Sequence, residues 1–410
     1  MVKRTPRTNA GSQTLDWPAL HEAADRLAAG VAPMIPARPR AAEINRRLRS
    51  LATFAANMRI NRRRLRAGNE AIRPLFYIWT MLNACNFACG YCDNHRGEKY
   101  PDLPNRGALD TERGKALLRI MRTGTSALYF CGGEPTLRPD LPTLTAEARR
   151  LNYWPLMINT NGSRFHHLLL QPAWAEWLSH MDVIIVSLDS LDPNVLAEMY
   201  DYPHPEEVIV NILALAKLSK IAGFKMFLNT VIQPGRVDDA RDVLEFCEKL
   251  DCWFAFAPLN AGAGLSDELA CDPAYTPFAK DLIERSRRGA KIVGAPELLE
   301  RVLFGEPIDC LPTAFSHVSP EGKVEWPCKP AVNVPSVHVP VLEHATLDDV
   351  WGKGRSLIEP TTFHGSGPSQ CGGECNWMQH YVADAFVRLT RHPTRQRWVA
   401  SSLWRFLVKR

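Results

Sequence analysis

The sequence lacks the features of a membrane-spanning or exported protein. It contains no run of about 18 apolar residues, the length that a transmembrane helix needs. Polar sequence follows Met1 to Arg4 in place of the apolar segment of a signal peptide, so we expect a cytoplasmic protein. Because disulfides are rare in the cytosol, the 11 cysteines are expected to bind metal.

Acidic residues are scarce at both ends of the chain. Between Arg38 and Arg73 there are eleven arginines and two glutamates, and Arg388 to Arg410 holds seven basic residues and no acidic one. Such basic segments attract an anionic surface, either a membrane or a nucleic acid. The first segment has no aromatic series on which bases could stack, so a nucleic-acid partner is disfavoured.

Both basic segments are predicted to be helical. Residues 40–67 repeat apolar side chains at helical spacing, at Ile44, Leu48, Leu51, Ala55 and Met58. This helix either packs on the rest of the protein or lies on anionic lipid, at the inner face of the membrane. Thr394–Arg410 mixes tryptophan and leucine with arginine and allows the same two interpretations. A shorter helix is predicted over residues 15–30.

Three cysteines lie close together in the sequence without a fourth cysteine nearby. Cys85, Cys89 and Cys92 have CxxxCxxC spacing and follow an apolar segment, Pro74–Leu82, that is predicted to be a strand. Three thiolates can hold three corners of a [4Fe–4S] cube and leave one iron open for chemistry. The alternatives are a zinc site, for which His95 is the nearest fourth ligand, and three unrelated buried cysteines.

An alternation of strand and helix follows Pro74. Strands are predicted at 75–82, 126–131, 155–160, 182–188, 225–232 and 252–258. Helices are predicted between them at 110–122, 140–151, 164–179, 193–199, 205–222 and 238–250. Six successive β-α units favour a parallel sheet curled into a partial (β/α)6 barrel, whose chemistry lies at the carboxyl ends of the strands.

Polar sequences stand at these strand ends. After the second strand comes Cys131-Gly-Gly-Glu-Pro-Thr136, where the glycines let the backbone approach a ligand and Glu134 or free carbonyls can accept from an ammonium group. The third strand ends in Asn159-Thr-Asn-Gly162, the fourth in Ser187-Leu-Asp189-Ser190, and the fifth carries Asn229. Together they indicate a single site.

The CxxxCxxC loop followed by GGEP resembles the radical S-adenosylmethionine (radical SAM) superfamily over residues 74–260. The resemblance implies that Cys85, Cys89 and Cys92 hold the cluster and that S-adenosylmethionine binds its open iron. It assigns the methionyl amine to Gly132, Gly133 and Glu134, and the adenine to Tyr91. Further cofactor contacts are expected from Asn159, Ser187, Asp189 and Asn229. Reductive cleavage would give a 5′-deoxyadenosyl radical that removes hydrogen from a substrate C–H bond.

Four more cysteines follow the barrel, at Cys310, Cys328, Cys371 and Cys375. With a hairpin predicted over Val318–Trp326 and a short helix at Leu347–Trp351, they resemble the SPASM or twitch extension of radical SAM proteins. The resemblance implies one auxiliary [4Fe–4S] cluster. A structural zinc is the alternative, since a four-thiolate site suits either metal.

The remaining cysteines are expected to be structural, except one. Cys131, Cys247 and Cys252 are assigned to packing, and Cys271 is a candidate donor of hydrogen or a proton. The expected domains are an arginine-rich helical extension (1–73), the barrel (74–260), linker helices (261–305), the auxiliary-cluster domain (306–385) and a basic terminal helix (386–410).

The expected reaction is oxidative or bond-forming, because an auxiliary cluster can take an electron from the substrate. The basic ends favour a membrane lipid or isoprenoid substrate. The alternative is a maturase that forms cross-links in a ribosomally made peptide. A protein of another class, a non-catalytic electron carrier or scaffold with two metal sites, would need a closed first site. A reductant such as flavodoxin or ferredoxin is the expected protein partner.

Overall fold

The computed structural model describes residues 15–69, 71–92, 107–261, 264–306, 312–326, 337–357 and 378–391. Nine strands form one sheet in the order β11-β10-β9-β1-β2-β3-β4-β5-β6. The strands are β1 (Phe76–Thr80), β2 (Leu128–Cys131), β3 (Leu156–Thr160), β4 (Val183–Ser187), β5 (Lys225–Ile232), β6 (Trp253–Pro258), β9 (Phe315–Val318), β10 (Lys323–Trp326) and β11 (Val337–Pro340). A separate pair is formed by β7 (Asn260–Ala261) and β8 (Gly264–Leu265).

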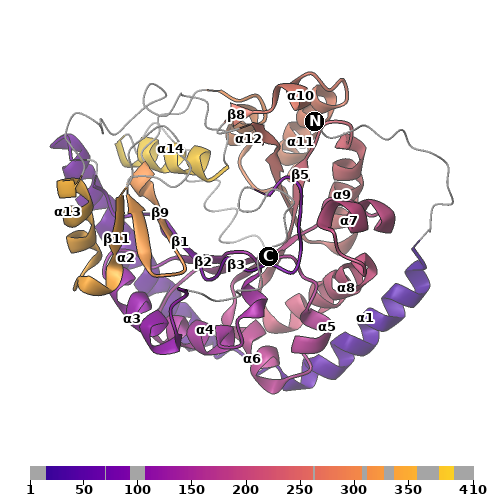
Figure 1. Cartoon of the computed structure of the whole chain (residues 1–410), viewed down its shortest axis with the longest axis horizontal. Helices are drawn as coiled ribbons and strands as arrows, with labels where there is room; N and C mark the ends of the chain where they lie inside the picture. The colour runs from indigo at the N-terminus through magenta and orange to yellow at the C-terminus, as the bar shows by residue number, and fades with distance from the viewer. Residues whose placement is uncertain are drawn as a thin grey trace.

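Helices surround the curled sheet (Figure 1). The two N-terminal helices are α1 (Trp17–Val31) and α2 (Arg40–Arg66). The barrel helices are α3 (Thr111–Met121), α4 (Leu141–Arg150), α5 (Phe165–Leu168), α6 (Pro172–His180), α7 (Pro193–Tyr200), α8 (Pro205–Ala222) and α9 (Val237–Leu250). After the sixth strand come α10 (Asp267–Ala270), α11 (Tyr275–Arg287), α12 (Pro296–Leu303), α13 (Leu347–Leu357) and α14 (Met378–Arg391).

The predicted partial barrel is confirmed. Strands β1 to β6 are parallel neighbours in chain order, each joined to the next by helices. Local signals set the helix starts, because Asp110 accepts from the Arg113 N–H at 2.8 Å and Asp192 accepts from the Asn194 N–H at 2.9 Å. The single helix predicted over 164–179 is instead α5 and α6, because Pro172 starts a new helix.

The predicted hairpin is present, and it extends the barrel. β9 pairs in parallel with β1, with His317 opposite Ile78, and β10 runs antiparallel to both β9 and β11. The sequence reasoning did not anticipate this pairing, since it joins segments more than 230 residues apart. The strand that leads into the cysteine loop therefore lies between β2 and the hairpin.

The inner face of the barrel is apolar near the amino ends of the strands and polar near their carboxyl ends. Near the amino ends of the strands a cluster of Val183, Phe227, Trp253 and Ala255 fills the interior, with Met157 packed against it. Side chains two residues further along a strand share the same face. Asn159, Ser187 and Asn229 thus follow Met157, Ile185 and Phe227 at the carboxyl ends, which gives the barrel an apolar base and a polar mouth.

Helix α2 packs through Phe54, Met58 and Leu65 and also through polar side chains, so only part of the predicted apolar stripe is covered. Ser50, Asn57 and Asn61 are buried, and the Asn57 amide donates to the Gly124 carbonyl at 2.7 Å. Ile44 and Leu48 of the predicted apolar stripe are instead 58% and 61% exposed. Buried hydrogen-bonding groups must find partners, and the barrel surface supplies them here.

Helix α14 packs against α2 and α12, with Phe386 close to Phe54. It runs through the expected domain boundary at residue 385. Within the ranges that the structure describes, no helix is long and apolar enough to cross a membrane. The predicted helix over Thr394–Arg410 lies outside the described residues.

Candidate active site

The cysteine loop follows β1 at the carboxyl edge of the sheet and is held by backbone contacts. Cys85, Cys89 and Cys92 are all partly exposed free thiols. The Ala88 N–H donates to the Tyr200 carbonyl at 2.8 Å, and the Cys92 N–H donates to the Cys89 carbonyl at 3.1 Å. The loop is therefore fixed both to itself and to the end of α7.

The three thiols lie close enough to influence one another electrostatically. Burial raises the pKa of the Cys85 thiol to about 12, and the nearby Glu134 and Cys92 act in the same direction. Burial also raises the pKa of Cys89, with Asp189 and Cys85 adding to it. Thiols of this kind ionise when a metal binds and stabilises the thiolates. This donor set fits a metal cluster.

A cluster and a single metal ion require different arrangements of their ligands. Among the described residues, no three His, Cys, Asp or Glu side chains converge on a point where one metal ion could bind. A [4Fe–4S] cube binds each thiolate through a different iron atom, so its ligands need not converge in this way. His95, the fourth ligand of the zinc alternative, lies outside the described residues.

The two glycines after β2 pack directly against the segment that leads into the cysteine loop. The Gly133 N–H donates to the Leu82 carbonyl at 2.9 Å. A Cβ atom on Gly132 would lie 2.5 Å from the Leu82 carbonyl oxygen, and one on Gly133 would lie 2.0 Å from the Ala84 carbonyl oxygen. No side chain fits at either position, because the turn packs on the backbone before Cys85. The close approach to a ligand that the sequence predicts stays a prediction.

The carboxylate of Glu134 holds the glycine turn together through hydrogen bonds. Its side chain is fully buried. One carboxylate oxygen accepts from the Thr136 N–H at 2.9 Å, the Thr136 hydroxyl at 2.6 Å and the Thr160 hydroxyl at 2.7 Å, and the other accepts from the Asn161 N–H at 2.7 Å. Burial raises the pKa of Glu134 against the opposing effect of these donors. The carboxylate thus ties the end of β2 to the end of β3.

The backbone of the glycine turn offers free acceptors beside this carboxylate. Within the described residues, neither the Gly132 carbonyl nor the Gly133 carbonyl accepts a hydrogen bond. Both lie beside the loop that carries Cys85. They are therefore better placed than the buried carboxylate of Glu134 to accept from an ammonium group.

Asn161 contacts the cysteine loop, which the sequence reasoning did not predict. Its amide donates to the Asn86 side chain at 2.8 Å and approaches the Cys85 sulfur at 3.9 Å. The Ser163 hydroxyl donates to the Asn161 side-chain oxygen at 2.8 Å and fixes the amide. The signal was available, because Asn161 belongs to the same Asn159–Gly162 turn that was singled out.

Tyr91 and Asp189, predicted as separate cofactor contacts, bind each other. The Tyr91 hydroxyl donates to the Asp189 carboxylate, which also accepts from the Val231 N–H at 2.7 Å. Burial raises the pKa of Asp189 to about 6, although the hydrogen bonds from Tyr91 and Val231 oppose the shift. This pair connects the cysteine loop to the ends of β4 and β5.

Three further predicted residues reach the polar mouth of the barrel. Ser187 and Asn229 are paired in the register of β4 and β5. The side-chain oxygen of Asn159 is buried and has no hydrogen-bond partner among the described residues. A buried polar atom without a partner is costly, so Asn159 is suited to a bound donor group.

The other cysteines differ in burial and in their distance from the glycine turn. Cys247 and Cys252 are buried in the core, as expected. The Cys131 sulfur lies 3.7 Å from the Thr80 hydroxyl, beside the glycine turn. Cys271 is exposed at the end of α10, and none of its described contacts is with the cysteine loop. The four auxiliary cysteines (Cys310, Cys328, Cys371 and Cys375) lie outside the described residues.

Comparison with known proteins agrees with this geometry. Residues 79–247 match the family model described as the Radical SAM superfamily. The chain is 26% identical over 322 residues to a PqqA peptide cyclase of Xanthomonas campestris pv. campestris (strain B100), which covers 74% of this chain and 81% of that relative.

Two solved structures share the fold. The crystal structure of Streptococcus suis SuiB matches with a TM-score of 0.50 and 19% identity, over 68% of this chain and 65% of that one. Native anSMEcpe with bound AdoMet matches with a TM-score of 0.51 and 18% identity, over 81% of this chain and 95% of that one. Both likenesses support the partial barrel.

Proposed function

We propose that this chain is a radical SAM enzyme that modifies a peptide. The observation that carries the proposal is the likeness to a PqqA peptide cyclase over 81% of that relative. It favours the peptide maturase over the lipid or isoprenoid substrate that the basic ends suggested. Ring closure or cross-linking is the bond-forming chemistry that we propose.

The cofactors of the superfamily are a [4Fe–4S] cluster and S-adenosylmethionine. When bound, they supply a 5′-deoxyadenosyl radical that removes hydrogen from a C–H bond. Cys85, Cys89 and Cys92 would hold the cluster, and the Gly132 and Gly133 carbonyls would accept from the methionyl amine.

The remaining predicted contacts support this arrangement from neighbouring strands. Glu134 and Asn161 fix the turn and the loop against each other. Tyr91 and Asp189 would border the adenosine, and Asn159, Ser187 and Asn229 would supply polar contacts at the mouth of the barrel. Their role is to orient the reacting groups, because the cofactor carries the chemistry.

A second cluster would allow an oxidative reaction, because it could accept an electron from the substrate. Forming a bond after loss of one hydrogen atom releases a further electron and a proton, and an auxiliary [4Fe–4S] cluster at Cys310, Cys328, Cys371 and Cys375 is the proposed acceptor. A flavodoxin or ferredoxin is the proposed source of the electron that starts the reaction. Cys271, whose side chain is exposed, stays a proposed hydrogen donor.

Metal content and S-adenosylmethionine cleavage test the proposal. Anaerobically reconstituted protein is expected to hold about eight iron atoms, four for each cluster. Four iron atoms with one zinc would instead favour the zinc alternative. Replacing Cys85, Cys89 and Cys92 by alanine should abolish deoxyadenosine formation, and retained cleavage would contradict the first site. A protein that never cleaves S-adenosylmethionine would favour the non-catalytic alternative.

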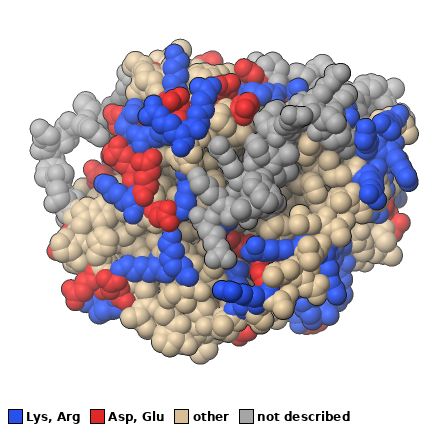
Figure 2. Space-filling view, turned by 180° about the vertical axis from the view of Figure 1, so that it is seen from behind, with Lys and Arg blue, Asp and Glu red and all other residues tan. Residues whose placement is uncertain are grey.

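A second proposed property is peripheral contact with an anionic membrane through α2. Ile44, Leu48 and Leu51 form an exposed apolar row on this helix. Arg40, Arg59, Arg62, Arg63 and Arg66 have no ion-pair partner among the described residues. Apolar side chains flanked by arginines suit the boundary of an anionic bilayer. Figure 2 shows a cluster of Lys and Arg along the edge that corresponds to the α2 side of Figure 1.

Flotation with vesicles tests this contact. The protein is expected to float with phosphatidylglycerol-containing vesicles and to remain behind with pure phosphatidylcholine. The change Leu48→Glu should reduce flotation, whereas Ile221→Glu, at a residue of similar exposure on α8, should not. Equal flotation of both variants would refute a contact through α2, and removal of residues 392–410 tests the second basic segment.

A further inference from the structure

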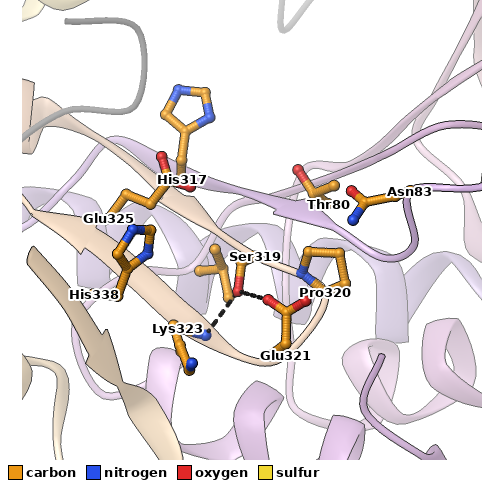
Figure 3. Close-up of a pocket in the computed structure, with 10 residues that line it drawn as sticks. Thr80, Asn83, His317, Ser319, Pro320, Glu321, Lys323, Glu325 and His338 are labelled. Atoms are coloured by element: carbon orange, nitrogen blue, oxygen red, sulfur yellow. Dashed lines mark hydrogen bonds between the residues drawn. The ribbon is translucent and has the colours of Figure 1, made fainter. Parts of the chain in front are cut away.

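A cavity of about 420 Å³ lies between the end of β1 and the hairpin β9–β11 (Figure 3). Thr80 and Asn83 line it from the β1 side, and His317, Glu325 and His338 line it from the hairpin. Its volume is within the range of small-molecule sites, roughly 300–1,000 Å³, and is sufficient for one long side chain. The proposed chemistry above uses none of the three hairpin residues.

These three residues form a row across the hairpin. Glu325 is opposite His338 in the register of β10 and β11, and the pairing of Val324 with Val318 places Glu325 beside His317. Residues opposite one another on neighbouring strands present their side chains to the same face. Figure 3 shows the two imidazoles on either side of Glu325. The row runs from a buried residue, His317, to an exposed one, His338.

Glu325 is the unusual member of the row. Its side chain is only partly exposed, yet no Lys, Arg or His nitrogen of the described chain lies within ion-pairing distance of its carboxylate. The other carboxylate of the cavity, Glu321, accepts from the Ser319 hydroxyl at 2.6 Å. A carboxylate removed from bulk water is stabilised by a cation or a charge-assisted donor. Glu325 lacks both within the part of the chain that the structure describes.

We propose that this cavity binds a cationic side chain, that of lysine or arginine, of the substrate. The inference rests on the peptide substrate proposed above and specifies which part of it the hairpin recognises. Glu325 would pair with the ammonium or guanidinium group, and His317 and His338 would border it with polar ring atoms. The aliphatic stem of the side chain would extend toward β1.

The position of the cavity connects it to the reacting end of the barrel. The Thr80 hydroxyl contacts the Cys131 sulfur at 3.7 Å, directly before the glycine turn. The Asn83 carbonyl oxygen lies 2.4 Å from the position of a Cβ on Gly133. A side chain held by Glu325 would therefore anchor the peptide beside the cofactor turn, which makes Glu325 a positioning residue.

The test uses small analogues of the two side chains, since the peptide is unidentified. The full-length protein with ¹³C-labelled histidine is titrated with N-acetyl-arginine amide and N-acetyl-lysine amide, and the signals of His317 and His338 are followed by NMR. At least one analogue should shift both signals in a saturable way. Glu325→Gln should weaken its binding at least about tenfold, the scale of one charge-assisted hydrogen bond.

Matched variants control for nonspecific changes. Glu321→Gln removes a carboxylate from the same cavity and should weaken binding much less than Glu325→Gln, because Glu321 already accepts a hydrogen bond from the Ser319 hydroxyl. Lys323 also lines the cavity. Lys323→Glu removes its positive charge and adds a negative one two residues from Glu325, and should tighten binding. N-acetyl-norleucine amide, which is uncharged, should produce no saturable shift.

Two results would overturn the inference. One is the absence of a saturable shift with both cationic analogues; the other is equal affinity in the wild-type protein and Glu325→Gln. Cleavage of S-adenosylmethionine by the wild-type protein is measured separately. Its failure would refute the proposed enzymatic function without affecting the binding result, so the two outcomes remain distinguishable.

Discussion

Replacing Glu134 by glutamine separates two roles for the glutamate of the GGEP turn. Its carboxylate accepts four hydrogen bonds, three on one oxygen and one from the Asn161 N–H on the other. The carbonyl of glutamine can replace the first oxygen. Its NH2 group then takes the place of the second carboxylate oxygen and faces the Asn161 N–H. Two donors therefore oppose each other in a buried site.

The expected cost follows from these contacts. One hydrogen bond to a charged acceptor is lost, worth about 1.5–3 kcal/mol, and a buried N–H remains without a partner at a cost of about 1–3 kcal/mol. Allowing for relaxation, Glu134→Gln should lower the free energy of unfolding by about 2–4 kcal/mol. Because Asn161 also contacts Cys85 and Asn86, iron incorporation at the first site should fall as well.

The measurement is urea unfolding of the metal-free protein, followed by iron content and deoxyadenosine formation after anaerobic reconstitution. Glu112→Gln, at an exposed residue in the first turn of α3, is the control for loss of charge. If the carboxylate itself binds the methionyl amine, the variant should instead raise the KM for S-adenosylmethionine at unchanged stability. An unchanged urea midpoint would therefore refute the structural role.

Three further changes test other parts of the structure. Asp182→Asn should destabilise the protein by about 3–5 kcal/mol in urea unfolding, because it leaves Arg149 buried without its bidentate partner; a loss below 1 kcal/mol would contradict this. Burial, reinforced by nearby arginines, lowers the pKa of His180 to about 4, so stability should be full above pH 6.5 and fall by up to about 3 kcal/mol toward pH 4 as the unfolded chain takes up the proton first. His180→Gln should remove that part of the pH dependence and His21→Gln should not. Gly133→Ala should abolish cluster binding, because its methyl group would lie 2.0 Å from a carbonyl oxygen of the loop.

Local patterns were sufficient for much of the fold. The six β-α units, the cysteine loop and the glycine turn were predicted because hydrophobic periodicity and glycine spacing report on the backbone nearby. The division of α5 from α6 was missed because the apolar pattern continues across Pro172. The packing of α2 on the barrel was one of two interpretations, but its covered face was only partly predicted: Met58 packs, whereas Ile44 and Leu48 are exposed.

The contacts of individual site residues could not be predicted from the sequence, because they join different strands and loops. Tyr91 and Asp189 were each predicted to contact the cofactor, but their bond to each other joins residues 98 positions apart. The turn Asn159–Gly162 was singled out from the sequence, but which of its two amides contacts the cysteine loop was visible only in the structure.

The sequence by itself determined the chemistry of this protein. Three cysteines at CxxxCxxC spacing and a glycine turn are local features, and their meaning depends only on residue type and spacing. The tertiary structure decided which side chains lie beside the cysteine loop, because the pairing of β9 with β1 brings Glu325 and its two histidines next to a segment more than 230 residues earlier in the chain. Strand pairing over that distance leaves no periodic signal in the sequence, so only the folded chain reveals the cavity.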